Sequence, residues 1–320
     1  MDSLKYWVEE YNVDGFRFDL MGLIDLETMT AAVKELKQMK PDILIYGEPW
    51  SAGVTPNPKI EKGTQRSRGF SVFNDNFRDA VKGSVFDLSP GYVQSGVNRD
   101  KIIKGIAGSI DDFTDSPLET INYVSSHDNQ TLWDRINLTS GTVATIDQMK
   151  RMDMLAAAIV LTSQGIPFIH SGEEFLRTKK GEDNSYNLPD SVNMINWSLK
   201  KENYQVFRYY RDIIALRKNH PAFRMKTAAA VRKNLKFYED LNIPVEQPCV
   251  AYVINGSPAG DEFKNIVVLI NPSRKPVIFS LPEGRFAQVL DENGLSVNTG
   301  KILSGKTEVP AISLYVLKSL

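Results

Sequence analysis

The sequence has few of the residues that form disulfides and transition-metal sites. Its 320 residues include one cysteine, Cys249, and three histidines, His127, His170 and His220. A single cysteine excludes an internal disulfide and a cysteine-rich metal site. Three scattered histidines argue against a histidine-cluster site, and no dedicated calcium site is apparent. The sequence therefore predicts that no cofactor is needed.

Long apolar runs and an excess of charge of either sign are also absent. No segment approaches the ~20 apolar residues of a membrane helix, and no basic stretch precedes an apolar run at the N-terminus as in a signal peptide. The formal net charge is −1. Balanced charge gives no reason to expect a nucleic acid or a membrane surface as partner.

The chain opens directly on a helical pattern with apolar residues at Leu4, Trp7, Val8 and Tyr11. A chain that begins inside a helix is expected to have lost what preceded it. The sequence therefore does not determine the cellular compartment. The cytoplasm is slightly favoured, and secretion is the alternative because the native N-terminus is expected to be missing.

Short apolar runs alternate with helical patterns over residues 1–222. The predicted strands are Val13–Leu20, Ile43–Tyr46, Phe70–Phe73, Ile121–Ser125 and Ile166–His170. The helices between and after them include Gln148–Ser163 and Tyr204–Asn219. Such alternation predicts a parallel α/β sheet, and polar residues at the strand ends favour a (β/α) barrel.

The pattern changes after residue 222. The strand-like runs there are Cys249–Val253, Ile266–Leu269, Val277–Leu281, Ala287–Leu290 and Ile312–Leu317. Turn residues separate them, and no long helical period appears. We predict two domains, 1–222 with the α/β pattern and 223–320 with an antiparallel β-sandwich.

Two strand ends carry carboxylates with distinct surroundings. Arg17 and Asp19 are two residues apart in a strand, so both side chains face the same way and the guanidinium is expected to keep Asp19 ionised. Glu48 ends an apolar strand beside Trp50, where burial would favour a protonated carboxyl. An ionised nucleophile and a protonated general acid are the pair that glycoside hydrolysis requires. On spacing alone, a structural ion pair and a structural acid are the alternatives.

A third polar pair, His127 and Asp128, follows the strand-like run 121–125. These side chains are candidates for binding sugar hydroxyls, and a simple turn is the alternative. Serine-nucleophile and phosphate-loop motifs are absent, which weakens the competing enzyme classes.

Several segments resemble the α-amylase superfamily, glycoside hydrolase family 13, and within it the type I pullulanases. They are Asp14–Gly22 (DGFRFDLMG), Tyr46–Trp50 (YGEPW), Ser125–Asn129 (SSHDN), Phe73–Gly83 (FNDNFRDAVKG) and Arg177–Asn193 (RTKKGEDNSYNLPDSVN). The resemblance covers nearly the whole chain. Val13–Leu20 resembles the fourth strand of the family's barrel, which implies strands 4–8 of an incomplete (β/α)8 TIM-type barrel followed by the β-sandwich.

The resemblance also implies roles for individual residues. Asp19 would be the nucleophile, Glu48 the acid/base and Asp128 the transition-state stabiliser. The substrate-binding residues would be Arg17, His127, Trp50, Met21, Tyr186, Asn187 and Asn193.

The implied activity is cleavage of α-1,6 branch linkages in pullulan, starch or glycogen, with a branched α-glucan as the partner. An isoamylase-like or glycogen-debranching enzyme, and a catalytically silent glucan-binding fragment, are the alternatives. Calcium occurs in some members of the family. Since three barrel strands are missing, we also expect self-association through exposed sheet edges.

Overall fold

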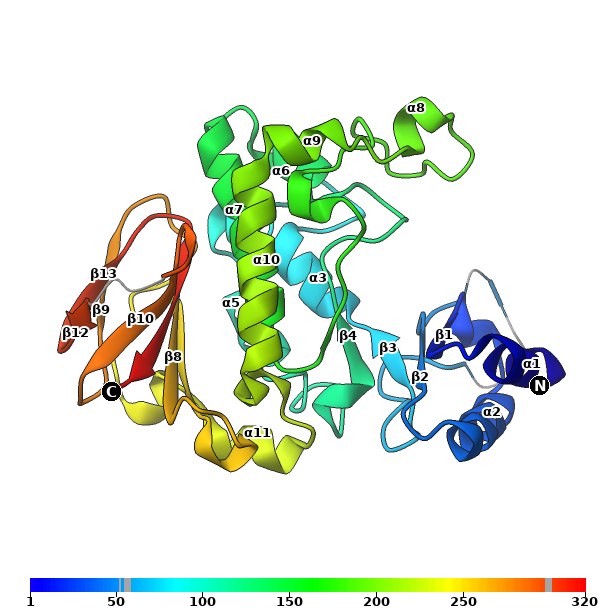
Figure 1. The fold of residues 1–320 in the computed structure, drawn as a ribbon. Helices are drawn as coiled ribbons and strands as arrows, with labels where there is room; N and C mark the ends of the chain where they lie inside the picture. The colour runs from blue at the N-terminus through cyan, green and yellow to red at the C-terminus, as the bar shows by residue number, and fades with distance from the viewer. Residues whose placement is uncertain (52, 55–58, 297–300) are drawn as a thin grey trace.

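The computed structural model describes residues 1–51, 53–54, 59–296 and 301–320 (Figure 1). Its first part is built on a parallel sheet of five strands in the order β1-β2-β3-β4-β5. These are β1 (Gly15–Phe18), β2 (Leu44–Gly47), β3 (Ser71–Phe73), β4 (Thr120–Asn122) and β5 (Ile166–Pro167). All five predicted strands are therefore confirmed as one parallel sheet. β2 has the predicted length of four residues, and the other four strands are shorter than the apolar runs that predicted them.

Eleven α-helices are found among the described residues. They are α1 (Asp2–Tyr11), α2 (Leu26–Met39), α3 (Asp75–Lys82), α4 (Tyr92–Ser95), α5 (Arg99–Ile106), α6 (Leu132–Ser140), α7 (Ile146–Thr162), α8 (Asp190–Asn193), α9 (Ser198–Glu202), α10 (Tyr204–Asn219) and α11 (Ala228–Asn234). Side-chain caps fix several starts: the Asp25 carboxylate accepts from Thr28 N at 2.8 Å, and Thr145 and Gln148 form a reciprocal capping box. No helix in the described part of the chain is long and apolar enough to cross a membrane.

In the second part, every strand pairing among the described residues is antiparallel. Its strands are β6 (Leu235–Phe237), β7 (Val250–Asn255), β8 (Asn265–Asn271), β9 (Val277–Ser280), β10 (Phe286–Asp291), β11 (Gly294–Leu295), β12 (Ile302–Leu303), β13 (Lys306–Val309) and β14 (Ser313–Ser319). One sheet has the order β11-β10-β14-β8-β7-β6, with β12 on β10, and β13 pairs with β9 in a second sheet.

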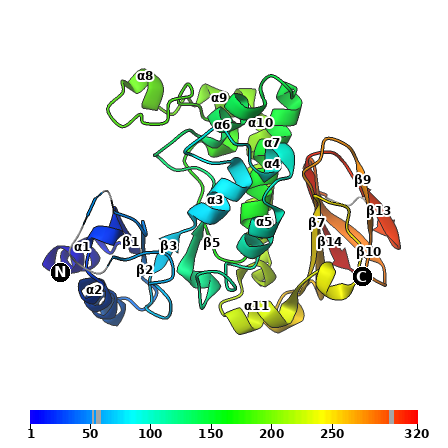
Figure 2. The same ribbon diagram turned by 180° about the vertical axis from the view of Figure 1, so that it is seen from behind.

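The larger antiparallel sheet is buried on both faces. Ala251, Val267 and Leu269 pack toward the β9–β13 pair, whereas their neighbours Tyr252 and Val268 pack with the helices α7 and α10. Figures 1 and 2 show these helices between the parallel sheet and the antiparallel sheets. One hydrophobic cluster thus runs across residue 222, and the division at 222/223 stays a prediction.

Cys249 lies in the cluster between the two antiparallel sheets. Burial raises the pKa of its thiol to about 12, so it behaves as a small apolar side chain.

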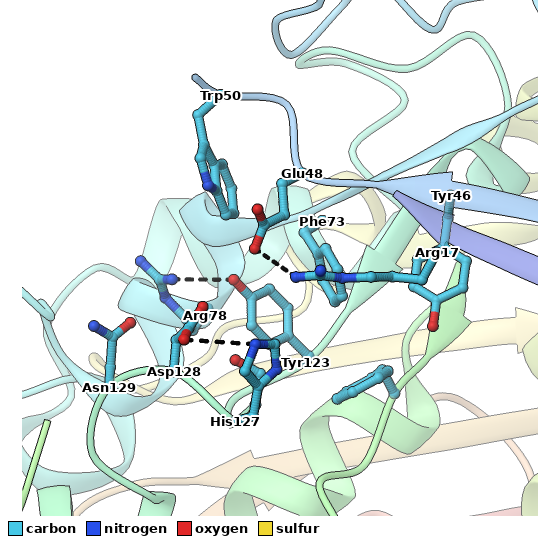
Figure 3. Close-up of a pocket in the computed structure, with 12 residues that line it drawn as sticks. Arg17, Tyr46, Glu48, Trp50, Phe73, Arg78, Tyr123, His127, Asp128 and Asn129 are labelled. Atoms are coloured by element: carbon cyan, nitrogen blue, oxygen red, sulfur yellow. Dashed lines mark hydrogen bonds and ion pairs between the residues drawn. The ribbon is translucent and has the colours of Figure 1, made fainter. Parts of the chain in front are cut away.

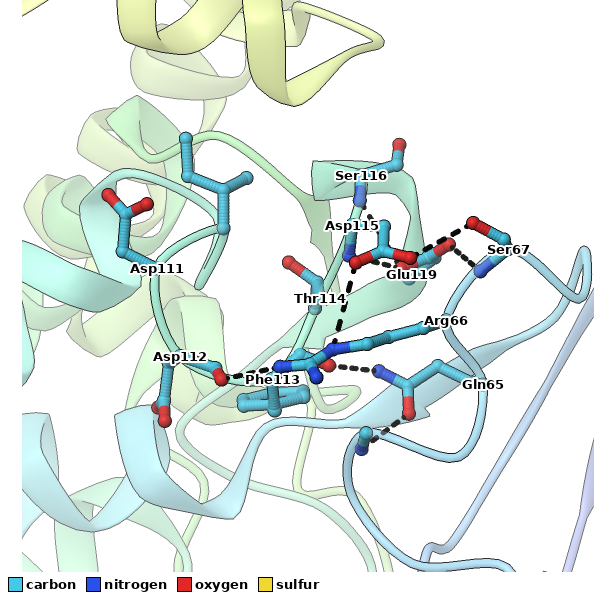
Figure 4. Close-up of polar contacts among 12 residues, drawn as sticks. Gln65, Arg66, Ser67, Asp111, Asp112, Phe113, Thr114, Asp115, Ser116 and Glu119 are labelled. Carbon is cyan, nitrogen blue, oxygen red and sulfur yellow. Dashed lines mark hydrogen bonds and ion pairs between the residues drawn. The ribbon is translucent and has the colours of Figure 1, made fainter.

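A buried carboxylate joins the loop after β2 to the loop before β4 (Figure 4). Glu119 is 6% exposed and accepts hydrogen bonds from Ser67 N at 2.7 Å, Asp115 N at 2.7 Å and Ser116 N at 3.2 Å. Arg66 adds a bond to the Asp112 carbonyl oxygen at 2.7 Å. Because β3 lies between these loops, the cluster holds the β1–β2 end of the sheet against the rest.

Replacing Glu119 with glutamine is expected to lower the free energy of unfolding by about 1–3 kcal/mol. The amide can accept at only one of its two terminal atoms, so at least one of the buried N–H groups loses its partner. Urea unfolding of the variant and of the exposed control Glu61→Gln measures the difference. Equal stability of the two variants would show that the three bonds contribute nothing net.

Candidate active site

A cavity of about 240 Å³ opens at the carboxyl ends of the parallel strands (Figure 3). Its lining residues are Arg17, Tyr46, Glu48, Trp50, Phe73, Arg78, Tyr123, Ser126, His127, Asp128, Asn129 and Phe168. The polypeptide runs in the same direction in every strand of this sheet, so strand ends distant in sequence deliver side chains to one place.

Arg17 is the central cation of the site. Its guanidinium donates to Asp19 Oδ1 at 2.5 Å and to Glu48 Oε1 at 2.6 Å. The predicted contact between Arg17 and Asp19 is therefore present. The second contact was not predicted, since it depends on β1 and β2 being parallel neighbours in register, with Arg17 opposite Tyr46.

Glu48 is buried, with 4% of its surface exposed, as its apolar strand indicated. Leu20 N donates to its second oxygen, Oε2, at 2.8 Å. Its two oxygens therefore accept from Arg17 and from the Leu20 amide, and the prediction of a protonated Glu48 stays a prediction. Leu20 adopts the left-handed region, with φ 40°, in the turn by which the chain leaves β1.

Asp19 lies beside the cavity lining. Its side chain is 68% exposed, and Arg17 is its only hydrogen-bond partner among the side chains that the structure describes. The two carboxylates thus share one guanidinium from opposite environments, one dry and one open to solvent.

Aromatic rings form the floor of the cavity. The Phe73 ring centroid lies 5.5 Å from that of Tyr46, 4.8 Å from Tyr123 and 5.6 Å from Phe168, in each case edge to face. Arg78 of α3 donates to the Tyr123 hydroxyl at 3.0 Å. An apolar floor below polar groups suits a ligand with ring faces and hydroxyls.

Sequence reasoning missed Arg78, Tyr123 and the floor rings as site residues. Their strands were predicted, and alternation within a strand would have placed Tyr123 on one face. It would not have shown which face is inside the cavity, because that depends on the neighbouring strands.

Trp50 is positioned by a close backbone approach. Gly22 N donates to the Trp50 carbonyl oxygen at 3.0 Å, and a Cβ on Gly22 would lie 2.5 Å from that oxygen. Only glycine permits this approach, so the loop after β1 sets the place of Trp50 at the cavity.

His127 and Asp128 face the cavity from the loop after β4. Their side chains are 3.5 Å apart and are 63% and 57% exposed. Lys179 Nζ donates to the His127 carbonyl oxygen at 2.9 Å, and burial lowers the pKa of this lysine. Burial, reinforced by Arg177, lowers the pKa of nearby His170 to about 3, so that imidazole is neutral at physiological pH.

The remaining predicted binding residues are not brought to this cavity. Met21 is fully buried in the cluster beneath β1 and β2, which corrects its assignment as a substrate-binding residue: the turn after Asp19 directs it inward. Tyr186 is 80% exposed on the loop before α8, and Asn187 is beside it. Asn193 donates to the Ser185 and Leu188 carbonyl oxygens at 2.6 and 3.0 Å, which holds that loop together. Figure 1 shows α8 on a loop that projects from the helices.

The part of the chain that the structure describes contains no group of three or more histidine, cysteine, aspartate or glutamate side chains arranged to hold a metal ion. The prediction that no cofactor is needed stays a prediction.

Comparison with known proteins shows which family this chain resembles. A model described as "Pullulanase, all-beta domain" matches residues 231–294. The pullulanase of Bacillus subtilis (strain 168) is 40% identical over 293 residues, which cover 88% of this chain and 40% of that protein. The solved pullulanase from Bacillus acidopullulyticus has 44% identity and a TM-score of 0.95, covering 99% of this chain and 39% of its own.

Over nearly its whole length the chain is similar to the C-terminal portion of type I pullulanases of glycoside hydrolase family 13. A second solved pullulanase, type I from B. subtilis str. 168 in complex with maltose, has 35% identity and a TM-score of 0.92 over 99% of this chain and 45% of that one. In all of these pullulanases the similarity lies in less than half of the relative's length. The sequence resemblance stated above is thus confirmed for the C-terminal portion of the family's members.

Proposed function

We propose that this chain carries the catalytic site of a debranching hydrolase that cleaves α-1,6 linkages in branched α-glucans and retains the anomeric configuration. The observation that carries the proposal is the pair of carboxylates on neighbouring strand ends, Asp19 and Glu48, joined by Arg17 at a cavity with an aromatic floor. Similarity to pullulanases supports the substrate class.

In this mechanism Asp19 attacks the anomeric carbon, and Glu48 protonates the departing glycosidic oxygen. Water then hydrolyses the glycosyl–Asp19 intermediate, with Glu48 acting as the base. A retaining enzyme needs its two carboxyl groups about 5–5.5 Å apart. Asp128 and His127 would bind hydroxyls of the distorted sugar, and Trp50 would stack on a ring face.

A proton on Glu48 is required for the first step, although Arg17 now contacts this carboxyl. We propose that substrate binding draws Arg17 toward Asp19 and the sugar, which leaves Glu48 with the Leu20 amide alone.

The fold assignment goes with this proposal. The five parallel strands correspond to strands 4–8 of a (β/α)8 barrel, and the antiparallel sheets form a C-terminal β-sandwich. Among the residues that the structure describes, β1 and β5 are the two end strands of this sheet.

The exposure of Asp19 favours a second candidate, a glucan-binding chain without turnover, because this side chain is 68% exposed rather than enclosed. Reducing-sugar release from pullulan and from amylopectin by the purified chain separates the possibilities. Release from pullulan supports the main proposal, and release from amylopectin alone supports an isoamylase-like or glycogen-debranching enzyme. Binding of maltotriose without release from either polymer would identify the silent chain.

A further inference from the structure

Two buried lysines donate to the backbone of the loop that carries His127 and Asp128. Lys179 Nζ donates to the His127 carbonyl oxygen at 2.9 Å, and Lys82 Nζ donates to the Gln130 carbonyl oxygen at 3.0 Å. We propose that both lysines are positioning residues, which fix this loop so that Asp128 meets the sugar. The inference rests on the proposed function, in which Asp128 binds a hydroxyl of the substrate.

The burial of these two ammonium groups is costly. Lys82 and Lys179 are each 1% exposed, and neither forms an ion pair with a carboxylate in the part of the chain that the structure describes. Burial, with Arg78 nearby, lowers the pKa of Lys82 to about 7, and burial lowers the pKa of Lys179 as well. An apolar side chain of similar volume is often as stable as a buried ion or more so. Packing alone therefore does not account for lysine at these two positions, whereas a donor to the loop does.

The loop contains a residue whose backbone has to be held. Asn129 adopts the left-handed region, with φ 59°, and lines the cavity beside Asp128 (Figure 3). A non-glycine residue persists in this region where its surroundings fix it. The carbonyl groups of His127 and Gln130, which accept from the lysines, lie on either side of it. The two bonds therefore oppose a relaxation of the loop that would move Asp128.

Lys179 is itself held in place. Its backbone N–H donates to Asp134 Oδ2 at 2.7 Å, and the Thr178 hydroxyl donates to the other oxygen of this carboxylate. Asp134 is 5% exposed and lies in the first turn of α6, where its own N–H donates to the N-cap Thr131 at 3.1 Å. The segment after β5 is thus joined to the start of the helix that follows the loop, so the ammonium of Lys179 meets the loop from a fixed position.

Lys82 is the last residue of α3, and the helix holds the same segment at a second point. The Lys82 carbonyl oxygen accepts from Gln94 Nε2 at 2.8 Å, which fixes the end of the helix. One turn earlier, Arg78 donates to the Tyr123 hydroxyl at 3.0 Å. Residues four apart lie on the same face of a helix. α3 therefore anchors the chain at Tyr123, before the cavity-facing pair, and at Gln130, after it.

Lys179→Met tests the proposal, because it removes the ammonium and nearly keeps the volume of the side chain. The variant is expected to release reducing sugar from pullulan roughly 10- to 100-fold more slowly, since a small misplacement of a substrate-binding group has an effect of this size. Binding of maltotriose should change far less, and Lys82→Met should act in the same direction. The matched control is Lys236→Met, which removes a bond from Lys236 Nζ to the Arg232 carbonyl oxygen at 2.6 Å outside the cavity and should keep full activity.

A double variant separates positioning from a general effect on the fold. In an Asp128→Asn background, Lys179→Met is expected to lower turnover by less than about threefold, because the carboxylate that the lysine places is then absent. A lysine that only supports the fold would lower turnover by the same factor in both backgrounds. Equal factors, or a control Lys236→Met that loses as much activity, would overturn the proposal.

A measurement without substrate keeps this proposal separate from the proposed function. The chain has three histidines, so isotopic labelling of histidine gives three backbone amide signals, and His127→Gln assigns one of them. The heteronuclear NOE of the His127 amide is expected to be that of an ordered residue in the unmodified chain and to fall in Lys179→Met, because the loop then moves on the picosecond to nanosecond timescale.

Circular dichroism checks folding, and Lys179→Gln replaces a methionine variant that fails to fold. An unchanged NOE would contradict the positioning role even in an active chain. A chain that releases no sugar, but whose His127 NOE falls in the variant, would contradict the proposed function and leave the anchoring of the loop by Lys179 supported.

Discussion

Replacing Glu48 with glutamine is expected to lower pullulan hydrolysis by roughly 10²–10⁴-fold, because an amide cannot protonate the departing oxygen. Replacing Asp19 with asparagine should reduce turnover at least as much, since no covalent intermediate can then form. Both changes keep the size of the side chain. Reducing-sugar release gives turnover, and maltotriose titration gives binding, which should change far less than turnover.

Asp14→Asn is the matched control for these variants. Asp14 immediately precedes β1, its side chain is 95% exposed, and it pairs with Lys40 away from the cavity. It should keep full activity. If Asp19→Asn hydrolyses pullulan as fast as the unmodified chain, the assigned nucleophile is wrong. If Glu48→Gln does so, the assigned acid is wrong.

The second large effect concerns two acids buried beneath the helices, Asp153 of α7 and Glu173 after β5. The Tyr210 hydroxyl lies 2.9 Å from Asp153 Oδ1 and 3.3 Å from Glu173 Oε1. A hydroxyl has one hydrogen to donate, so it satisfies one carboxylate at a time. The other oxygens, Asp153 Oδ2 and Glu173 Oε2, have no partner in the described part of the chain.

Burial raises the pKa of Asp153 to about 8, and it raises that of Glu173 as well, with Asp153 adding to the effect. Buried Lys82 of α3 is the nearby cation, and burial lowers its pKa to about 7. An acid whose pKa is higher in the folded chain than in the unfolded chain keeps its proton only when folded. The contribution of these two acids to stability is therefore greatest at acidic pH and falls as pH rises from about 4 toward 8.

Asp153→Asn should reduce this loss. The amide oxygen still accepts from Tyr210, and no charge forms as pH rises. Each proton released only on unfolding contributes up to about 1.4 kcal/mol per pH unit. We expect the variant to gain stability over the unmodified chain progressively between pH 5 and pH 8, measured by urea unfolding at each pH.

The exposed control Glu308→Gln should follow the unmodified chain at every pH. Parallel pH profiles for Asp153→Asn and the unmodified chain would show that Asp153 is ionised in both states. Lys82 acts in the opposite direction above pH 7, because it releases a proton on folding, so the comparison ends at pH 8.

The sequence predicted the elements better than the contacts between them. Tyr204–Asn219 has the same bounds in the structure as in the prediction, because its apolar period is regular and His220-Pro221 ends it. The five strands could be recognised because each apolar run ends in polar residues. Local patterns of this kind do not depend on the rest of the fold.

The site contacts depend on neighbours that no local pattern shows. Arg17 reaches Glu48 only because β1 and β2 are in register, and Leu20 N reaches it from the turn that follows β1. Met21 was grouped with the binding residues from its place beside Asp19, yet the same turn directs its side chain into the core. Asp153 and Glu173 come from separate elements, so their shared tyrosine could not be predicted from spacing.

One apolar face of the larger antiparallel sheet is covered by helices that precede it in the chain. Tyr252 and Val268 turn one face of the sheet toward α7 and α10. A protein that began near residue 222 would therefore expose one apolar face of this sheet to solvent, and we expect it to precipitate during expression. A fusion of this segment to another enzyme would have to include α7 and α10, or replace the apolar residues of that face with polar ones.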